Sequence, residues 1–400
     1  MSIQNIGNRC CGCGLCKSLC PQKAIEFLRN CDGYEFPYIH KNKCIDCNLC
    51  EEKCPIINSD LKKTVSLRSG AAYAKDERIK FYGSSGGLFG AIAKKIITDG
   101  GIVFGAGFDN QHQLKTMSAE TEDELLPLYK SKYILSNTDN CYIKIKEALK
   151  LGRKVLFCSS PCQIHALNLY LEKDEPNLIT VDFLCHGVGN QSLFDESIMY
   201  LENKYGITIT NFTFRDKHVG NKAASHYYYS YEFFKDGFEK ELYQKEDIFL
   251  SFPYFLAYES RLICRDECYV CPFLNKSRVS DITIGDFHSI EKFTKEIDRL
   301  AGVSLFVCNT KKGNELFSSL GDSVWVKDIP FEEISKENRF IRDETGIPKK
   351  KKELLRSINE SGIEKAYSKM LWTNKIRIYN IYYKSPKFLR EIARKVLQIT

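Results

Sequence analysis

Eight cysteines in the first sixty residues recur with a spacing suited to metal ligation. Residues 10–21 read CCGCGLCKSLCP and residues 44–55 read CIDCNLCEEKCP, so both runs fit the pattern CxxCxxCxxxCP. In bacterial two-cluster ferredoxins, the fourth cysteine of each such run binds the other cluster. We therefore expect two 4Fe–4S clusters, the first held by Cys10, Cys13, Cys16 and Cys54 and the second by Cys44, Cys47, Cys50 and Cys20.

Two further cysteines of this region lie outside the pattern. Only Cys10 restores the ligand spacing, so we interpret the neighbouring Cys11 as structural, and Cys31 likewise. Zinc is a weaker interpretation of the two runs, because one ion needs only four thiolates and does not explain a three-plus-one grouping in each copy.

A second set of cysteines is spread over the body of the chain. Cys268 and Cys271 form a CxxC followed by proline, and a metal centre needs two more ligands. Cys162 and Cys185 each follow an apolar, strand-like run, and such turns gather along one edge of an open parallel sheet. We expect these four cysteines to hold a third 4Fe–4S cluster, with Cys264 as the alternative ligand and zinc as the alternative metal.

Cys162 has three other possible roles, of which the simplest is that of a small buried residue. It is three residues from His165, which could activate it as a nucleophile. It could also form a disulfide with Cys158, although disulfides are rare in a reducing compartment. None of these roles explains Cys185 or the CxxC, so we favour ligation.

Apolar runs alternate with helix-like patterns between residues 71 and 185. Strands are expected at 71–75, 101–108, 154–158 and 178–185, with a helix at 89–97, and this alternation predicts parallel pairing. Residues 121–124, TEDE, form a capping box that predicts another helix. Residues 207–243 read instead as antiparallel strands, with a hairpin turn at 235–237.

The expected fold class is α+β or α/β, in four parts. We expect a ferredoxin-type domain at 1–58, a polar linker at 59–70, a mixed α/β domain with a partly antiparallel sheet at 71–345, and a basic helical tail at 346–400. The tail carries 14 Lys and Arg against 4 Asp and Glu, whereas the first 345 residues carry 44 against 47. The tail is interpreted as a solvated helical face, and weak contact with a membrane surface or acidic partner is the alternative. No nucleic-acid partner is expected.

The chain shows the features of a cytoplasmic protein. No apolar run approaches the ~20 residues that a membrane helix needs. The first ten residues, MSIQNIGNRC, lack the apolar core of a signal peptide. Eighteen cysteines in a reducing compartment favour metal binding over disulfides.

The stretch YGSSGG at 82–87 lies between a strand-like and a helix-like segment. Ser84 or Ser85 could cap that helix. Free N–H groups at a helix start suit a phosphate, so the stretch is either a plain tight turn or a site for the phosphate of a flavin nucleotide.

Six short motifs, together with the N-terminal cysteine runs, resemble a known family in their order. They are YGSSGG (82–87), SPCQI (160–164), CHGV (185–188), FRDK (214–217), CPF (271–273) and SDITIGDF (280–287). Over roughly residues 1–310 the chain resembles the coenzyme F-420 hydrogenase/dehydrogenase beta-subunit family. The resemblance implies an oxidoreductase in which FAD exchanges a hydride with an organic substrate, and 4Fe–4S clusters pass single electrons to or from FAD.

The resemblance also implies particular residues and partners. FAD would contact Ser84, Ser85, Gly86 and Gly87, and would lie near Lys132, Tyr133 and Ser136. The candidate catalytic residues are His186 and Lys217. The substrate would be coenzyme F-420 or, in a bacterium, another small hydride donor or acceptor, and the redox partner a ferredoxin or another oxidoreductase subunit. The alternative function is a non-enzymatic electron-transfer subunit that docks to a partner enzyme.

Overall fold

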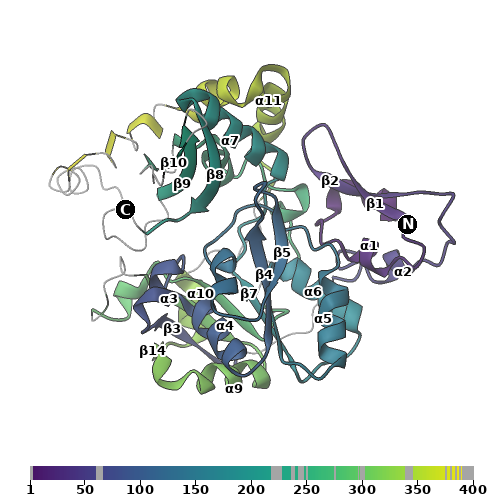
Figure 1. Ribbon diagram of the computed structural model, residues 1–400, viewed down its shortest axis with the longest axis vertical. Coiled ribbons are helices and arrows are strands. Elements are labelled where there is room, and N and C mark those ends of the chain that lie inside the picture. Colours follow the sequence, from purple (N-terminus) through teal and green to yellow (C-terminus); the bar gives the residue numbers. More distant parts are fainter. Residues whose placement is uncertain are drawn as a thin grey trace.

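Three sheets organise the described part of the chain, and helices cover both faces of the largest sheet (Figure 1). The computed structural model describes residues 3–59, 66–217, 228–235, 239–241, 247–248, 251–273, 276–295, 297, 302–337, 346–373, 376–378, 381–382, 385–386 and 389. The hairpin turn expected at 235–237 lies partly outside these residues, as does the middle of the expected linker.

The largest sheet has eight strands and is mixed. Its four central strands, β12, β7, β6 and β4, run parallel to one another, and the outer strands join them antiparallel. The expected alternation of strands and helices is therefore confirmed as a mixed α/β arrangement. In spatial order the strands are β14 (Val324–Asp328), β3 (Arg68–Ala74), β13 (Ser304–Cys308), β12 (Ile282–Asp286), β7 (Leu178–Phe183), β6 (Val155–Cys158), β4 (Ile102–Phe108) and β5 (Leu114–Ala119).

Successive side chains of a strand point to opposite faces of the sheet, so buried core residues lie on both faces of this sheet. On β6, Leu156 faces the side covered by α4 and α9, whereas Val155 and Phe157 face the side covered by α5 and α6. All three are fully buried, as is typical of parallel strands covered on both faces. The helices around this sheet are α3 (Glu77–Tyr82), α4 (Leu88–Thr98), α5 (Cys141–Lys150), α6 (Pro161–Leu171), α9 (Lys311–Ser319) and α10 (Phe331–Glu337).

A second, four-stranded sheet is antiparallel and packs through aromatic rings. It comprises β8 (Ile207–Phe214), β9 (Tyr228–Lys235), β10 (Glu239–Glu241) and β11 (Asp247–Ile248), so the antiparallel pattern expected here is confirmed. Helices α7 (Gln191–Tyr205) and α8 (Pro253–Glu259) pack beside it. The ring of Phe194 on α7 lies 5.4 Å from that of Phe212 and 5.5 Å from that of Tyr254, which fills the core between sheet and helices.

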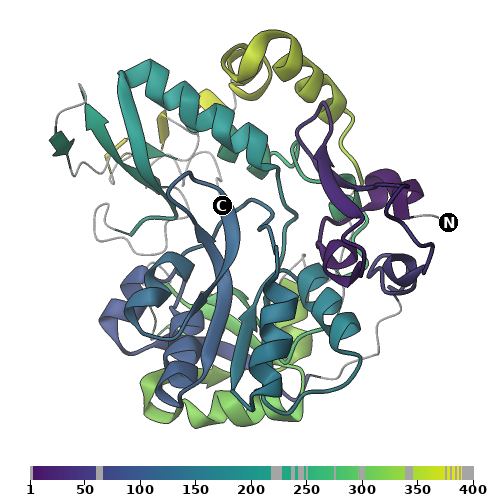
Figure 2. The same ribbon diagram turned by 45° about the vertical axis from the view of Figure 1, so that its right-hand side comes forward.

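The N-terminal segment lies against the body beside α5 and α6 (Figure 2). It contains the hairpin β1 (Ile25–Arg29) and β2 (Glu35–Ile39) and the short helices α1 (Leu15–Leu19) and α2 (Leu49–Glu52). Arg265 of the body fixes it: its Nε donates to the carbonyl of Cys10 at 3.0 Å and its Nη2 to that of Glu35 at 3.0 Å. The guanidinium also lies 4.6 Å from the ring centre of Phe36.

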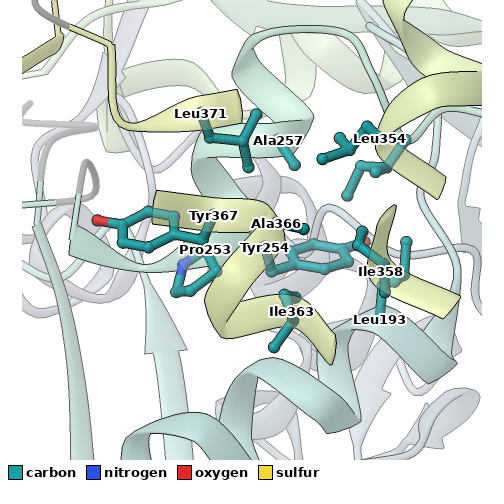
Figure 3. A pocket seen from close by; sticks show the side chains of 11 residues that line it. Leu193, Pro253, Tyr254, Ala257, Leu354, Ile358, Ile363, Ala366, Tyr367 and Leu371 are labelled. Carbon is teal, nitrogen blue, oxygen red and sulfur yellow. The ribbon is translucent and has the colours of Figure 1, made fainter. Parts of the chain in front are cut away.

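The first half of the basic tail folds onto the body as α11 (Lys350–Ala366). Figure 3 shows Leu354 and Ile358 beside Leu193 of α7 and Tyr254 of α8. Lys351 is buried, and its Nζ donates to the carbonyl of Cys264 and to Asp266 Oδ1, each at 2.5 Å. No helix in the described part of the chain has the length and apolar content of a membrane span.

The capping box expected at 121–124 forms, but it begins a 3₁₀ turn over Asp123–Leu128 and no α-helix. Thr121 N donates to Glu124 Oε2 at 3.1 Å, and Glu124 N donates to Thr121 Oγ1 at 3.4 Å. Pro127 lies within this turn and has no N–H to continue a regular helix, which explains the difference.

Replacing Arg265 with alanine should weaken the attachment of the N-terminal segment. The buried carbonyl of Cys10 and the partly buried carbonyl of Glu35 would lose a charged donor, so we expect the free energy of unfolding to fall by roughly 3 kcal/mol. Urea titration followed by circular dichroism measures this value. The matched control is Arg78→Ala, whose side chain is 62% exposed beside Asp123 and should change stability by less than about 0.5 kcal/mol. Equal effects of the two substitutions would contradict the anchoring role.

Candidate functional site

The four cysteines expected to hold the first N-terminal cluster lie together and are buried. Cys10, Cys13 and Cys16 come from the loop before α1 and its first turn, and Cys54 follows α2. The thiols of Cys10 and Cys16 each interact with that of Cys54, as the crossed ligand pattern requires. Burial raises the pKa of the Cys10, Cys16 and Cys54 thiols, and the pKa of Cys13 is also raised although the neighbouring Cys11 thiol opposes this, so thiolates would form here only beside a positive charge.

Two glycines let this loop approach the body closely. Gly12 and Gly14 have positive φ values of 73° and 79°. A Cβ on Gly12 would lie 2.5 Å from Leu135 Cδ2, and one on Gly14 would lie 2.3 Å from Thr138 Oγ1. Gly12 N donates to Cys10 Sγ at 3.3 Å, so the backbone also solvates a ligand sulfur.

The four cysteines expected to hold the second cluster line one cavity of about 190 Å³ near the surface: Cys20, Cys44, Cys47 and Cys50. Cys47 is exposed, and the other three are partly buried. Ile45 and Leu49, at 60% and 36% exposure, flank these thiols. The second group is therefore accessible from solvent, whereas the first group is covered.

The four body cysteines also line a single cavity, although they come from three distant parts of the chain. Cys162 lies in the first turn of α6, Cys185 follows β7, Cys268 lies in the 3₁₀ turn Asp266–Tyr269, and Cys271 follows that turn. The thiol of Cys185 interacts with the other three. Burial raises the pKa of Cys185, Cys268 and Cys271, and the neighbouring Cys11 thiol together with burial raises the pKa of Cys162. The sequence-predicted group is thus brought together.

The other roles considered for Cys162 find less support in the geometry. All cysteines of the chain are free, so Cys158 and Cys162 form no disulfide. The ring of His165 faces away toward the carbonyl of Asn58, with Nε2 at 2.9 Å from that oxygen. Cys264, the rival ligand, is fully buried beside Gly187 and is not among the residues lining the cavity. Among the described residues, no group of three or more His, Cys, Asp or Glu side chains is arranged so that it could hold a single metal ion.

Arg261 offers hydrogen-bond donors at the same cavity. Its Nη1 donates to the carbonyl of His186 at 2.7 Å, while its Nε and Nη2 are buried without a partner among the described residues. Gly187 N adds a donor to Cys185 Sγ at 3.4 Å. Buried donors beside four thiols fit an anionic iron–sulfur centre, because its sulfurs accept hydrogen bonds.

The 82–87 loop is tied into the body, and neither of its serines caps α4. Ser84 Oγ accepts from Ser131 N at 2.5 Å, and Ser85 Oγ donates to the carbonyl of Val303 at 2.7 Å. The helix instead begins after Gly87, whose φ of 78° turns the chain into α4. The expected serine cap is therefore wrong, because both hydroxyls are already used in tertiary contacts.

Three lysines, of which Lys217 is buried and Lys130 and Lys132 are partly buried, lie at or near this loop. Lys217 Nζ donates to the carbonyls of Ser85 and Lys80, each at 2.6 Å, and Lys130 Nζ donates to that of Phe81 at 3.1 Å. Lys132 Nζ donates to the carbonyls of Pro127 and Tyr129. Burial lowers the pKa of Lys217 to about 7, of Lys130 to about 8 and of Lys132 to about 7. An anionic group placed here would favour the charged forms.

Arg215 and Asp286 form a buried ion pair beside these lysines. Arg215 Nη1 and Nη2 donate to the two carboxylate oxygens of Asp286 at 2.6 and 3.0 Å. Burial opposes ionisation of Asp286, but Arg215 holds the pKa of that carboxyl well below its ordinary value. The Arg215 side chain also interacts with that of Tyr133. This interaction connects the ion pair to the 130–133 segment.

The remaining predicted residues divide between the two regions. His186 lines the thiol cavity, whereas Lys217 lies at the 82–87 loop, and no described contact joins them. The ring of Tyr133 lies between the two regions, 4.9 Å from that of Tyr258, whose hydroxyl donates to Gly187 O at 3.1 Å. Ser136 is placed near α6, where its hydroxyl bonds Gln163.

Sequence reasoning missed Lys130, Arg261 and the position of Cys11. None of them belongs to a motif with a fixed spacing. Lys130 directly precedes the SKYILS stretch, and Cys11 adjoins a predicted ligand. For these two residues, the signal in the sequence was their position next to residues already assigned to a site.

Breaking the buried ion pair should destabilise the protein. Asp286→Asn leaves Arg215 buried without a counter-charge, so we expect a loss of about 3 kcal/mol in urea titration at pH 7. In the wild type this contribution is present above the ordinary pKa of 3.8 and is lost as the pH falls below it. Asp328→Asn, whose pair with Arg68 is 61% exposed on the carboxylate side, should cost less than about 1 kcal/mol. A similar small loss in both variants would show that the buried pair contributes little.

Comparison with known proteins shows what the body of the chain is similar to. Residues 152–333 match the family described as the C terminus of the beta subunit of coenzyme F420 hydrogenase/dehydrogenase. Among solved structures, a chain of the F420-reducing NiFe hydrogenase complex from Methanosarcina barkeri, studied by xenon derivatization, is 20% identical with a TM-score of 0.44, over 77% of this chain and 91% of that chain. No curated protein matches the chain. Residues 152–333, a little under half of the chain, are therefore similar to the beta subunits of coenzyme F420 hydrogenase/dehydrogenase.

Proposed function

We propose that the protein is an FAD- and iron–sulfur-dependent oxidoreductase with three 4Fe–4S clusters. The observation that carries this proposal is the grouping of twelve cysteines into three sets of four. When bound, the clusters would pass single electrons and FAD would exchange a hydride, so together they would couple one-electron and two-electron reactions.

The three cysteine sets differ in exposure, and this difference supports an order in which electrons would pass between them. Cys47 and its neighbours are open to solvent, so a redox protein can approach the second set. The first set is buried, and its loop reaches the body cavity through Cys11. We propose the order second set, first set, body set and then FAD, with flow possible in either direction.

The 82–87 loop and its lysines support a flavin nucleotide site. Lys217 and Lys130 donate hydrogen bonds to backbone carbonyls, and neither forms an ion pair among the described residues, although Asp286 and Asp216 lie near enough to act on them. A pyrophosphate would supply the missing negative charge. Ser84, Ser85, Gly86 and Gly87 would hold this part of FAD, with Lys132 and Tyr133 beside it.

His186 and Lys217 remain the proposed catalytic residues, and their separate locations assign them different tasks. Lys217 would hold the anionic part of the cofactor or substrate at the loop. His186 would hold or move a proton near the thiol cavity. The proposed substrate is a small organic hydride donor or acceptor, either coenzyme F420 or another molecule, and the proposed partner is a ferredoxin or another oxidoreductase subunit.

Metal and flavin analysis of anaerobically purified protein tests this proposal. We expect about 12 iron and one FAD per chain, since each cubane holds four iron atoms. Cys271→Ser and Cys47→Ser should each remove about four iron, whereas Cys308→Ser, at a buried cysteine of β13, should remove none. About eight iron with one zinc would indicate a zinc-containing body. Full iron without flavin would indicate an electron-transfer subunit.

Flavin binding should be accompanied by proton uptake at pH 8. With a pKa of about 7, Lys217 is mostly neutral at this pH, and an adjacent phosphate would raise the pKa and charge it. Calorimetric titration of the flavin-free protein with FAD, in two buffers of different ionisation enthalpy, measures the protons bound. Lys217→Met should reduce uptake by about one proton. The exposed control Lys276→Met should not change it, and unchanged uptake in Lys217→Met would contradict the assignment.

A further inference from the structure

Cys11 is a fifth thiol at the body cavity. It lies in the N-terminal loop between Cys10 and Gly12, yet it lines the same cavity as Cys162, Cys185, Cys268 and Cys271. Its side chain is 7% exposed. The CxxC spacing of the first set does not need it, because Cys10 and Cys13 already supply that pair.

The thiol of Cys11 contacts one ligand from each of two sets. It interacts with the thiol of Cys13, which belongs to the first N-terminal set, and with that of Cys162, which belongs to the body set and lines the same cavity. A single side chain therefore spans the gap between the two groups of cysteines.

The backbone on both sides of Cys11 is fixed from the body. Arg265 Nε donates to the carbonyl of Cys10 at 3.0 Å. The carbonyl of Cys13 accepts from the hydroxyl of Tyr142 at 2.7 Å and from that of Thr138 at 3.1 Å. The position of the Cys11 thiol is thus determined by the docked loop.

We propose that Cys11 is a positioning residue that couples the first N-terminal cluster to the body cluster, by donating its S–H hydrogen bond to Cys13 or Cys162. This inference rests on the proposed function. With both clusters bound, the two ligand sulfurs are thiolates, so they compete as acceptors for one donor. Hydrogen bonds to ligand sulfurs help to set a cluster's reduction potential, so the donor stabilises whichever cluster it contacts in the reduced form.

The coupled step is a transfer of one electron. With both clusters bound, one would be oxidised by one electron and the other reduced by one electron. No covalent bond forms or breaks at Cys11, and its proton stays on its own sulfur. The thiol acts only through the hydrogen bond and through its place between the two ligands.

A redox titration monitored by electron paramagnetic resonance tests the proposal on the full-length protein with its clusters in place. Cys11→Ala and Cys11→Val both remove the donor, and valine also fills the vacated space. We expect both variants to retain about 12 iron. The midpoint potential of the first N-terminal cluster, the body cluster or both should fall by about 59 mV, equal to a tenfold change in a one-electron equilibrium.

Two comparisons separate the hydrogen bond from other effects. Cys11→Ser keeps a donor and should retain most of the wild-type potential, whereas Cys308→Ala removes a buried thiol elsewhere and should change neither potential. Unshifted potentials in Cys11→Ala and Cys11→Val would overturn the proposal. A loss of about four iron in both would also overturn it, because Cys11 would then be a cluster ligand itself.

A separate measurement, made on the wild-type protein, tests the proposed function itself. Wild-type protein with fewer than about 12 iron would refute three clusters before any Cys11 variant is compared. Wild-type protein with full iron but unshifted Cys11 variants would refute only the coupling role.

Discussion

The parallel alignment of β6 and β7 is the constraint on which the candidate site depends. Phe157 pairs with Thr180 and Cys158 with Val181, so both strands end at the same edge of the large sheet. Cys162 and Cys185 therefore approach one another although 23 positions separate them in the sequence. The 264–271 segment then completes the cavity from outside the sheet, and the N-terminal loop closes it from a third direction. A shift in this register would separate the thiols, because they share no local segment.

Two kinds of buried charge surround the site. Arg215 with Asp286 and Arg278 with Asp182 are matched pairs, with donor–acceptor distances of 2.6 and 2.9 Å. The lysines at the 82–87 loop bind neutral carbonyls instead, and burial lowers their pKa values. Matched pairs hold the framework in one arrangement, while Lys130 and Lys217, which form no ion pair among the described residues, would become more strongly charged beside a bound anion.

Much of the fold and of the cysteine grouping was predictable, because both follow from local spacing. The CxxCxxCxxxCP runs define the ligand sets by sequence distance, and alternating apolar runs define the strands of the large sheet. Strand-end geometry was enough to predict that Cys162 and Cys185 meet the CxxC. The serine cap failed because hydroxyl partners such as Val303 come from remote strands. Cys11 was interpreted as structural for the same reason: its contact with Cys162 depends on how the N-terminal loop docks, which no local pattern encodes.

The two long cationic side chains that clamp the 264–271 segment have a consequence for how the chain is made. Arg265 holds the N-terminal loop, and Lys351 of α11 holds the carbonyl of Cys264 and the carboxylate of Asp266. During synthesis the N-terminal cysteine runs leave the ribosome first, but these clamps are translated hundreds of residues later. Both clamps can therefore form only after most of the chain has emerged. Under the proposed function, metal delivery to the body cavity would accordingly be a late, post-translational event, separated in time from the loading of the first sixty residues.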